Sequence, residues 1–381
     1  MLIGLIEYLV IFALGILLIY AFQNCYSRIQ ISYEYFNLKL VDGLVYCFFG
    51  CLALLPLIAM YGLRYGIGVD YFSYEEIYNT LNPTPFDEYW IQHKNNANIY
   101  YVESGYYFLN RLLPSYRLLL WFIGLLLFIL FLLAVRDYIT RISFSIALLV
   151  LLSTQFIYSL NGVRFAIALM LFLNACKSLA NKKAVHYVVW VLAATLFHKS
   201  LLLCLPLVLL MQFKGERINK IRDRIMAIGI IAFPVISIFA LKVLSRFSFF
   251  ERYFSTEQYA STETMGGSFT WVMHVVPVLL PLILCRNVFY ESDEAKLYLR
   301  VCLMEIPFRM LGLYNSIYTR YARCSQIAQV LLIPLVLFSI PNKRNRVIMY
   351  CYYIVWYLFY FAYYAIVNDQ GDSLPYIWVF S

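Results

Sequence analysis

The chain is a succession of apolar runs, most of them near the length of a bilayer crossing, with charged residues gathered in the turns between them. A helix of about 20 apolar residues spans the hydrocarbon core, because its backbone polar groups are all bonded within the segment. Only 13% of the residues are charged and 63% are hydrophobic, which leaves too little polar surface for a soluble globule. We therefore predict an all-α polytopic membrane protein.

About twelve membrane helices are expected, in one integral domain covering residues 1–381. The predicted spans lie near residues 2–22, 43–62, 117–135, 143–160, 164–180, 185–198, 200–213, 225–244, 271–285, 299–314, 322–340 and 347–367. The two runs within 185–213 are near the lower length limit for a crossing. The first run lacks a basic leader and a small-residue cleavage signal, so we expect a retained helix and not a signal peptide.

Basic residues give the predicted orientation, because Lys and Arg are retained preferentially on the cytoplasmic side. With the N-terminus outside, the short turns 136–141 and 177–183 fall on the cytoplasmic face. The basic clusters 214–224 and 343–346 fall on the same face, which then holds most of the 30 basic residues. Both termini are expected outside.

The remaining basic residues stand at external helix ends or in external loops, where the retention rule does not account for them. The set is Arg64, Arg111, Arg117, Arg164, Lys199, Arg246, Arg252, Arg320 and Arg323. Placing a charged side chain against acyl chains costs free energy, so basic residues concentrated on this face predict a polar cavity that binds an anion. Guanidinium groups suit phosphate, since they pair bidentately and stay charged. For any single arginine, the alternative is snorkelling to lipid phosphates or pairing with a nearby glutamate.

Several other functions are not supported by the sequence. The net charge of +9 could suggest nucleic acid as a partner, but most of it lies in turns where membrane insertion requires it. The nine cysteines lie mostly inside apolar runs, without CxxC pairs or metal-ligand spacing. There is no Walker glycine loop. We expect neither a metal nor another cofactor.

Two larger external loops are predicted, at residues 64–116 and 246–270. The first interleaves carboxylates with many aromatic residues, a composition that suits carbohydrate, since rings stack on sugar faces and carboxylates accept hydroxyl hydrogen bonds. An interfacial aromatic belt is the alternative explanation of the tyrosines. Within this loop, Gly66 and Gly68 let the backbone turn tightly, which would direct Arg64 and Asp70 into one space.

Four motifs follow one another along the chain. They are Arg-x-x-x-Gly-x-Asp-Tyr-x-x-Tyr at 64–74, Glu-x-Gly-Tyr at 103–106, Val-Arg-x-x-Ile-Ala at 163–168 and Phe-His-Lys-Ser at 197–200. In this order they resemble the EpsG family of polysaccharide-assembly proteins, which is similar to Wzy O-antigen and capsule polymerases. The resemblance runs from about Tyr61 to Arg323.

The resemblance implies an inverting glycosyltransferase of the GT-C type at the outer face of the bacterial cytoplasmic membrane. Such an enzyme joins undecaprenyl-pyrophosphate-linked oligosaccharide units, which serve as donor and acceptor. The identity of the sugars and the binding of a chain-length regulator stay open.

The pyrophosphate leaving group requires fixed positive charge, and the acceptor hydroxyl requires a base. The predicted pyrophosphate ligands are Arg64, Arg164, Arg320 and Arg323. Asp70 is the predicted base or acceptor-orienting carboxylate, with Glu103 and His198 as rivals for that role, and Tyr71 and Tyr74 are expected to shape the pocket.

Two other functions stay open. A flippase of lipid-linked oligosaccharide would share the helices and the basic cavity, but it would be expected to carry internal repeats and charges through the membrane on both leaflets. A membrane O-acyltransferase would use His198 and would leave the external arginines without a role.

Overall fold

The computed structural model describes residues 2–35, 39–94, 102–211, 215–244, 267–284, 292–312, 317–366 and 373–380. Within these ranges the regular structure is helical, apart from one isolated bridge between Arg64 and Trp378. The chain forms two compact units. The first comprises Met1–Ala175, Val188–Leu202 and Ile333–Ser381, and the second comprises Cys176–Tyr187 and Leu203–Leu332.

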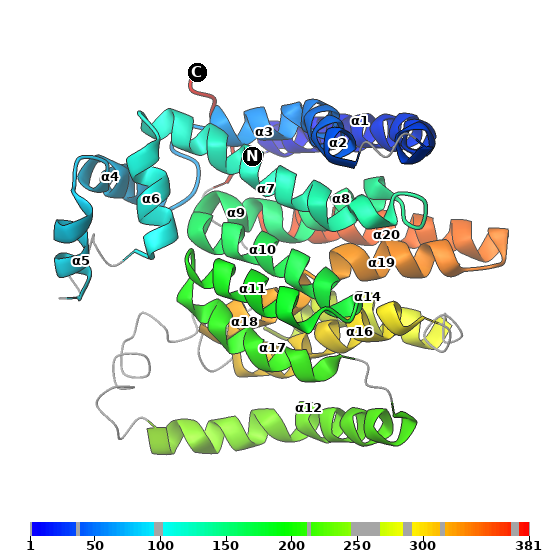
Figure 1. Ribbon diagram of the computed structural model, residues 1–381. Coiled ribbons are helices and arrows are strands. Elements are labelled where there is room, and N and C mark those ends of the chain that lie inside the picture. Colours follow the sequence, from blue (N-terminus) through cyan, green and yellow to red (C-terminus); the bar gives the residue numbers. More distant parts are fainter. Residues whose placement is uncertain are drawn as a thin grey trace. The chain divides into compact units, whose positions relative to one another are not determined.

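The first unit contains the helices from the N-terminal half of the chain and the C-terminal helix (Figure 1). Its helices are α1 (Leu2–Tyr35), α2 (Lys39–Ala53), α3 (Leu55–Gly62), α4 (Tyr71–Leu81), α5 (Phe86–Lys94), α6 (Ser104–Leu112), α7 (Tyr116–Val135), η1 (Arg136–Tyr138), α8 (Phe144–Leu151), η2 (Leu152–Phe156), α9 (Ile157–Asn161) and α20 (Lys343–Ile366). Four helices contribute residues to both units: α10 (Val163–Ala180), α11 (Ala184–Thr195), η3 (Lys199–Leu210) and α19 (Gln329–Ser339).

Six of the described helical segments are long and apolar enough to cross a membrane, and a bent pair adds a seventh crossing if it counts as one span. The six are Ile3–Arg28, Tyr116–Tyr138, Phe144–Asn161, Val163–Ala180, Tyr318–Ser339 and Lys343–Ile366. The chain is therefore a multi-pass membrane protein, as predicted. The expected twelve crossings and the GT-C-like arrangement are not confirmed by these helices.

The two runs predicted within 185–213 form shorter apolar helices, α11 and η3. A span predicted at 299–314 is divided into two helices in the structure, α16 (Asp293–Leu303) and α17 (Glu305–Gly312). The predicted external loop 246–270 lies outside the described residues, except for its last four, which begin α14 (Gly267–Leu284).

The bent pair is α2 and α3, whose axes differ by 65° at the break. Pro56 lies in the first turn of α3, where its ring is tolerated, but it cannot continue a preceding helix because it lacks an N–H and clashes with the turn before it. Beyond the break, α3 packs against α7. The Trp121 ring of α7 lies directly against the backbone of Gly62, which has no side chain to keep it away.

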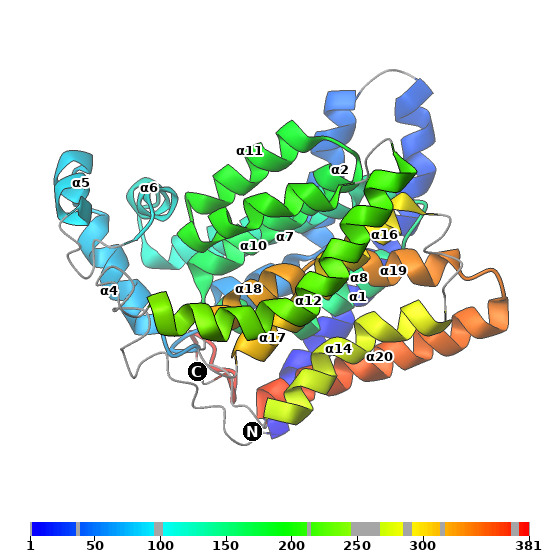
Figure 2. The same ribbon diagram turned by 90° about the horizontal axis from the view of Figure 1, so that it is seen from below.

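The predicted external loop 64–116 is a folded segment that contains α4, α5 and α6 (Figure 2). Its tyrosines form much of its core: the Tyr89 and Tyr107 rings stack with centroids 4.0 Å apart, and the Tyr107 hydroxyl donates to the Thr84 carbonyl. Gly105 N–H donates to the Leu196 carbonyl at 2.8 Å, which attaches α6 to the turn after α11. Many of these aromatic side chains are therefore occupied by packing.

The segment 373–380 pairs with the end of α3 and the residues that follow it. Tyr65 N–H donates to the Ile377 carbonyl at 3.0 Å, and Val379 N–H donates to the Leu63 carbonyl at 2.9 Å. The Tyr376 hydroxyl also donates to the Met60 carbonyl. These bonds hold the backbone on both sides of Arg64.

The second unit is built from helices of the C-terminal half (Figure 1). Besides the four shared helices, it contains α12 (Glu216–Leu244), α14 (Gly267–Leu284), α16 (Asp293–Leu303), α17 (Glu305–Gly312) and α18 (Ile317–Gln326). Within the unit, α17 packs against α18, α12 and α14. Its described charged groups include the ion pair of Arg300 Nε with Asp223 Oδ1 at 2.9 Å.

Candidate functional site

A tight turn after α3 brings the first motif against the end of α9. Gly66 and Gly68 have φ angles of +64° and +97°, which glycine adopts at no steric cost. A Cβ atom at Gly68 would lie 2.8 Å from the Leu160 carbonyl oxygen. The two glycines therefore allow the turn that the sequence predicts and permit a close backbone approach to the junction of α9 and α10.

Arg64 is fully buried at this turn, with 0% of its surface exposed. Its Nη1 donates to the Leu160 carbonyl and, at 3.4 Å, to the Ile67 carbonyl. The guanidinium carbon lies 4.6 Å from the centroid of the Tyr61 ring. Its Nε and Nη2 have no hydrogen-bond partner in the described structure. Since buried donors are nearly always satisfied, this guanidinium requires an acceptor.

A second arginine, Arg117, binds the same turn from the start of α7. Its Nη1 donates to the Gly62 carbonyl at 3.1 Å and to the Arg64 carbonyl at 2.6 Å, and its Nη2 lies 3.5 Å from the Tyr71 hydroxyl. The sequence placed Arg117 among the external basic residues but not among the site residues. Arg117 stands at a predicted helix start and belongs to none of the four motifs, so the sequence gave no reason to select it.

Tyr71 and Tyr74 are buried residues of α4. Burial raises the pKa of the Tyr71 phenol, and the nearby Arg117 and Arg64 oppose this shift only in part. Tyr71 is therefore a neutral hydroxyl at neutral pH. The Tyr74 ring packs edge-on against Tyr106, with centroids 5.7 Å apart. Both tyrosines contact arginines of this region, Tyr71 near Arg117 and Tyr74 beside Arg164, and their role in shaping a pocket stays a prediction.

Asp70 is exposed at the N-terminal end of α4. Its backbone N–H donates to Asn161 Oδ1 at 2.9 Å, so the last residue of α9 fixes the start of α4. The side chain of Asp70 makes no capping bond to α4. This exposed carboxylate lies six residues from Arg64 along the glycine turn.

Glu103 and Arg164 form an ion pair, with Arg164 Nη1 2.5 Å from Glu103 Oε2. The other carboxylate oxygen accepts the Lys199 backbone N–H at 3.1 Å, and Tyr74 is a further hydrogen-bonding neighbour of Arg164. Only 10% of the Glu103 side chain and 24% of the Arg164 side chain are exposed. Arg164 Nε is buried without a hydrogen-bond partner in the described structure. Arg164 thus resembles Arg64 in holding a buried N–H donor that requires an acceptor.

His198 is half-buried beside the same pair. Its Nδ1 lies 2.6 Å from Ser200 Oγ, and its ring packs edge-on against Phe165, the residue after Arg164, with centroids 4.9 Å apart. The backbone of the next residue, Lys199, binds Glu103. His198 is therefore close to the predicted site and has a hydroxyl partner there.

Seven of the nine predicted site residues thus gather around the junction of α9 and α10 in the first unit. Arg64 and the backbone of Asp70 bind the end of α9. Arg164, which pairs with Glu103, lies in the first turn of α10, directly after that end. The other two, Arg320 and Arg323, belong to α18 in the second unit, where Arg320 is half-buried and Arg323 is 4% exposed.

The second unit contains a buried polar cluster around Glu305, which is 1% exposed. Its Oε1 lies 3.0 Å from His274 Nδ1 and 3.2 Å from Arg309 Nε, and its Oε2 accepts from Gln329 at 3.1 Å. Arg323 acts electrostatically on both Glu305 and His274. Sequence reasoning missed this cluster. One sequence feature could have identified it: Glu305 and Arg309 stand four residues apart inside an apolar run, where ionisable residues are rare.

In the ranges that the structure describes, no group of three or more His, Cys, Asp or Glu side chains could hold a metal ion. The fixed positive charge of the site comes from arginines, which bind anions directly and cannot be deprotonated in proteins.

Comparisons with known proteins identify a family for most of the chain. The model of the EpsG family matches residues 47–378. No curated protein and no solved structure matches the chain. The matched range contains all nine predicted site residues and both polar clusters.

Proposed function

Because the chain belongs to the EpsG family, we propose that it is a polysaccharide polymerase that joins lipid-linked oligosaccharide repeat units. In this proposal the growing chain leaves undecaprenyl diphosphate and is transferred to a sugar hydroxyl of the incoming unit, at the outer face of the bacterial cytoplasmic membrane. The observation that best supports it is the pair of arginines at one helix junction, Arg64 and Arg164, whose buried N–H donors have no acceptor among the residues that the structure describes.

The arginines would act on the leaving group. When the bond between the anomeric carbon and the diphosphate oxygen breaks, the electron pair goes to that oxygen and negative charge develops on it. Fixed donors in a water-poor site stabilise such charge more than water does, because they are already oriented. The unpartnered nitrogens of Arg64 and Arg164 are suitable donors, and Arg117 adds a third positive charge beside Arg64. Arg320 and Arg323 stay proposed as further phosphate ligands.

Asp70 is the proposed base, because it is exposed and follows directly after the turn formed by Gly66 and Gly68. It would accept the proton of the acceptor hydroxyl as that oxygen attacks the anomeric carbon from the face opposite the diphosphate. This geometry inverts the configuration. Glu103 is less suited to the role, since both its oxygens already accept hydrogen bonds. We assign Glu103 to orienting Arg164, and His198, bonded to Ser200, stays the rival base.

The proposal is tested by incubating the purified protein with a lipid-linked oligosaccharide repeat unit in detergent, with chelator and without nucleotide. A ladder of products is expected from the unchanged protein and from the surface variant Glu76→Gln. No ladder is expected from Arg164→Ala or Asp70→Asn. Unchanged substrate, together with its movement between leaflets in liposomes, would overturn the polymerase and favour the flippase.

A further inference from the structure

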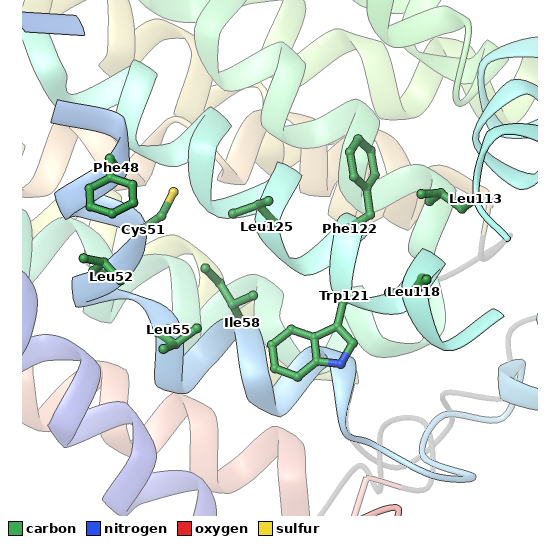
Figure 3. Close-up of a pocket in the computed structure, with 10 residues that line it drawn as sticks. All are labelled: Phe48, Cys51, Leu52, Leu55, Ile58, Leu113, Leu118, Trp121, Phe122 and Leu125. Atoms are coloured by element: carbon green, nitrogen blue, oxygen red, sulfur yellow. The ribbon is translucent and has the colours of Figure 1, made fainter. Parts of the chain in front are cut away.

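An apolar groove lies between the bend of α2 and α3 on one side and α7 on the other (Figure 3). Its volume is about 400 Å³. The walls include Phe48 and Leu52 from α2, Leu55 from α3, and Phe122 and Leu125 from α7. The ten described residues that line it are all uncharged. A groove of this size and composition suits a hydrocarbon chain.

The groove is open to the surroundings of the helices. Leu52, Leu55 and Leu118 are each 48% exposed, and Phe48 is 61% exposed. Leu118 lies near the start of a segment long and apolar enough to cross a membrane, and the other three belong to the bent pair of α2 and α3, which passes the same test as a pair. In a bilayer, the exposed apolar surface of such segments contacts acyl chains and not water. An occupant can therefore enter sideways from the hydrocarbon core.

One end of the groove lies near Arg64 and Arg117, although neither arginine is among the residues that line it. Trp121 lines the groove and lies directly against Gly62. Arg117, one turn earlier on α7, donates to the carbonyls of Gly62 and Arg64. From Leu118 to Leu125, the groove wall on α7 is about 10 Å long, at 1.5 Å of rise per residue. The groove thus begins within one helical turn of the charged groups.

We propose that this groove binds the isoprenoid chain of the lipid-linked substrate, in the first units after the diphosphate. The identity of this lipid rests on the proposed function. A lipid whose diphosphate binds at Arg64 and Arg117 needs an apolar surface for the isoprene units that follow the diphosphate. The groove offers this surface, because its wall on α7 begins within one helical turn of Arg117. The branched isoprenoid chain also fits a wall that carries three aromatic rings, of Phe48, Trp121 and Phe122.

The site is tested by photolabelling the full-length protein in liposomes. The probe is undecaprenyl diphosphate without saccharide, carrying a diazirine in the isoprene units nearest the diphosphate. Labelled peptides are expected from α2, α3 and the first half of α7, and unlabelled undecaprenyl diphosphate should compete while excess phosphatidylglycerol should not. Labelling spread over other helices, or competition by the phospholipid, would overturn the inference. Neither result depends on polymerisation, so failure of the polymerase proposal is seen separately.

A matched pair of variants adds a second test. Leu118→Trp fills the groove, whereas Leu192→Trp places the same side chain at a 47% exposed position on α11. Leu118→Trp should reduce labelling and raise KM for the long-chain carrier about tenfold, the equivalent of losing roughly two buried methylene groups. It should leave KM for a carrier with a two-unit chain unchanged. Equal behaviour of the two variants, or equal effects on both carriers, would overturn the groove assignment.

Discussion

The assignment of Glu103 as the residue that orients Arg164 is tested most directly by Glu103→Gln. The carboxylate accepts hydrogen bonds from Arg164 Nη1 at 2.5 Å and from Lys199 N–H at 3.1 Å. A glutamine keeps the shape, but it removes the charge and turns one acceptor into an NH₂ group that faces a donor. A hydrogen bond to a charged group contributes about 1.5–3 kcal/mol. We expect Glu103→Gln to lower the free energy of unfolding by about 2 kcal/mol.

The effect on turnover follows from the same contact. If Arg164 loses its fixed position, the stabilisation of the leaving group falls by a similar amount. A loss of about 2 kcal/mol corresponds to a rate reduced roughly thirtyfold. The assay is the initial rate of ladder formation from a lipid-linked repeat unit, with thermal unfolding measured on the same preparation. The control is Glu76→Gln, which removes an exposed carboxylate of α4 and should change neither quantity.

Two results would refute this reasoning in different ways. Wild-type turnover and stability in Glu103→Gln would show that the ion pair does not position Arg164. A loss of more than about a thousandfold with normal stability would instead assign Glu103 to proton transfer, the role proposed for Asp70.

Four further results are expected. Asp70→Asn should abolish polymer while the protein stays inserted and folded, and polymer of normal length and yield would contradict this. Arg164→Lys should fail in the ladder assay because an ammonium group lacks the planar fork, whereas near-normal turnover would favour a general electrostatic role. Gly68→Ala should lower the free energy of unfolding by about 1–3 kcal/mol, because the φ angle of +97° is strained for alanine. Gly229 has open space around it, so Gly229→Ala should not lower the free energy of unfolding. Equal thermal stability of the two variants would refute the strained turn. Glu305→Gln should lower stability by about 3–5 kcal/mol because a buried positive charge loses its partner, and an unchanged unfolding midpoint would refute that pairing.

The sequence was most informative where local chemistry decides the structure. Apolar runs near the length of a crossing predicted the spans at 117–135 and 164–180 within a few residues of the helices found. The turn at Gly66 and Gly68 was predictable too, because two glycines stand between the charged residues Arg64 and Asp70. The positive φ angles of both glycines confirm it. The break within 43–62 was not predicted, although Pro56 causes it.

Contacts between distant parts of the chain were less accessible to sequence reasoning. Arg164 and Glu103 were both selected, but nothing in a single sequence showed that residues 61 positions apart would pair with each other. The cluster around Glu305 was missed because its members, such as His274 and Gln329, lie on different helices and none belongs to a motif. Local periodicity identifies helices, whereas their pairing depends on tertiary packing.

The pairing of segment 373–380 with the residues beside Arg64 has a consequence for biosynthesis. Translation proceeds from the N-terminus, so α3 and the glycine turn leave the ribosome long before this segment does. The hydrogen bonds of Leu63 and Tyr65 with Val379 and Ile377 can form only after α20 has been synthesised. The turn at Arg64 therefore gains these bonds only late in synthesis, and a ribosome that stops after α20 releases a chain in which the backbone beside Arg64 lacks them.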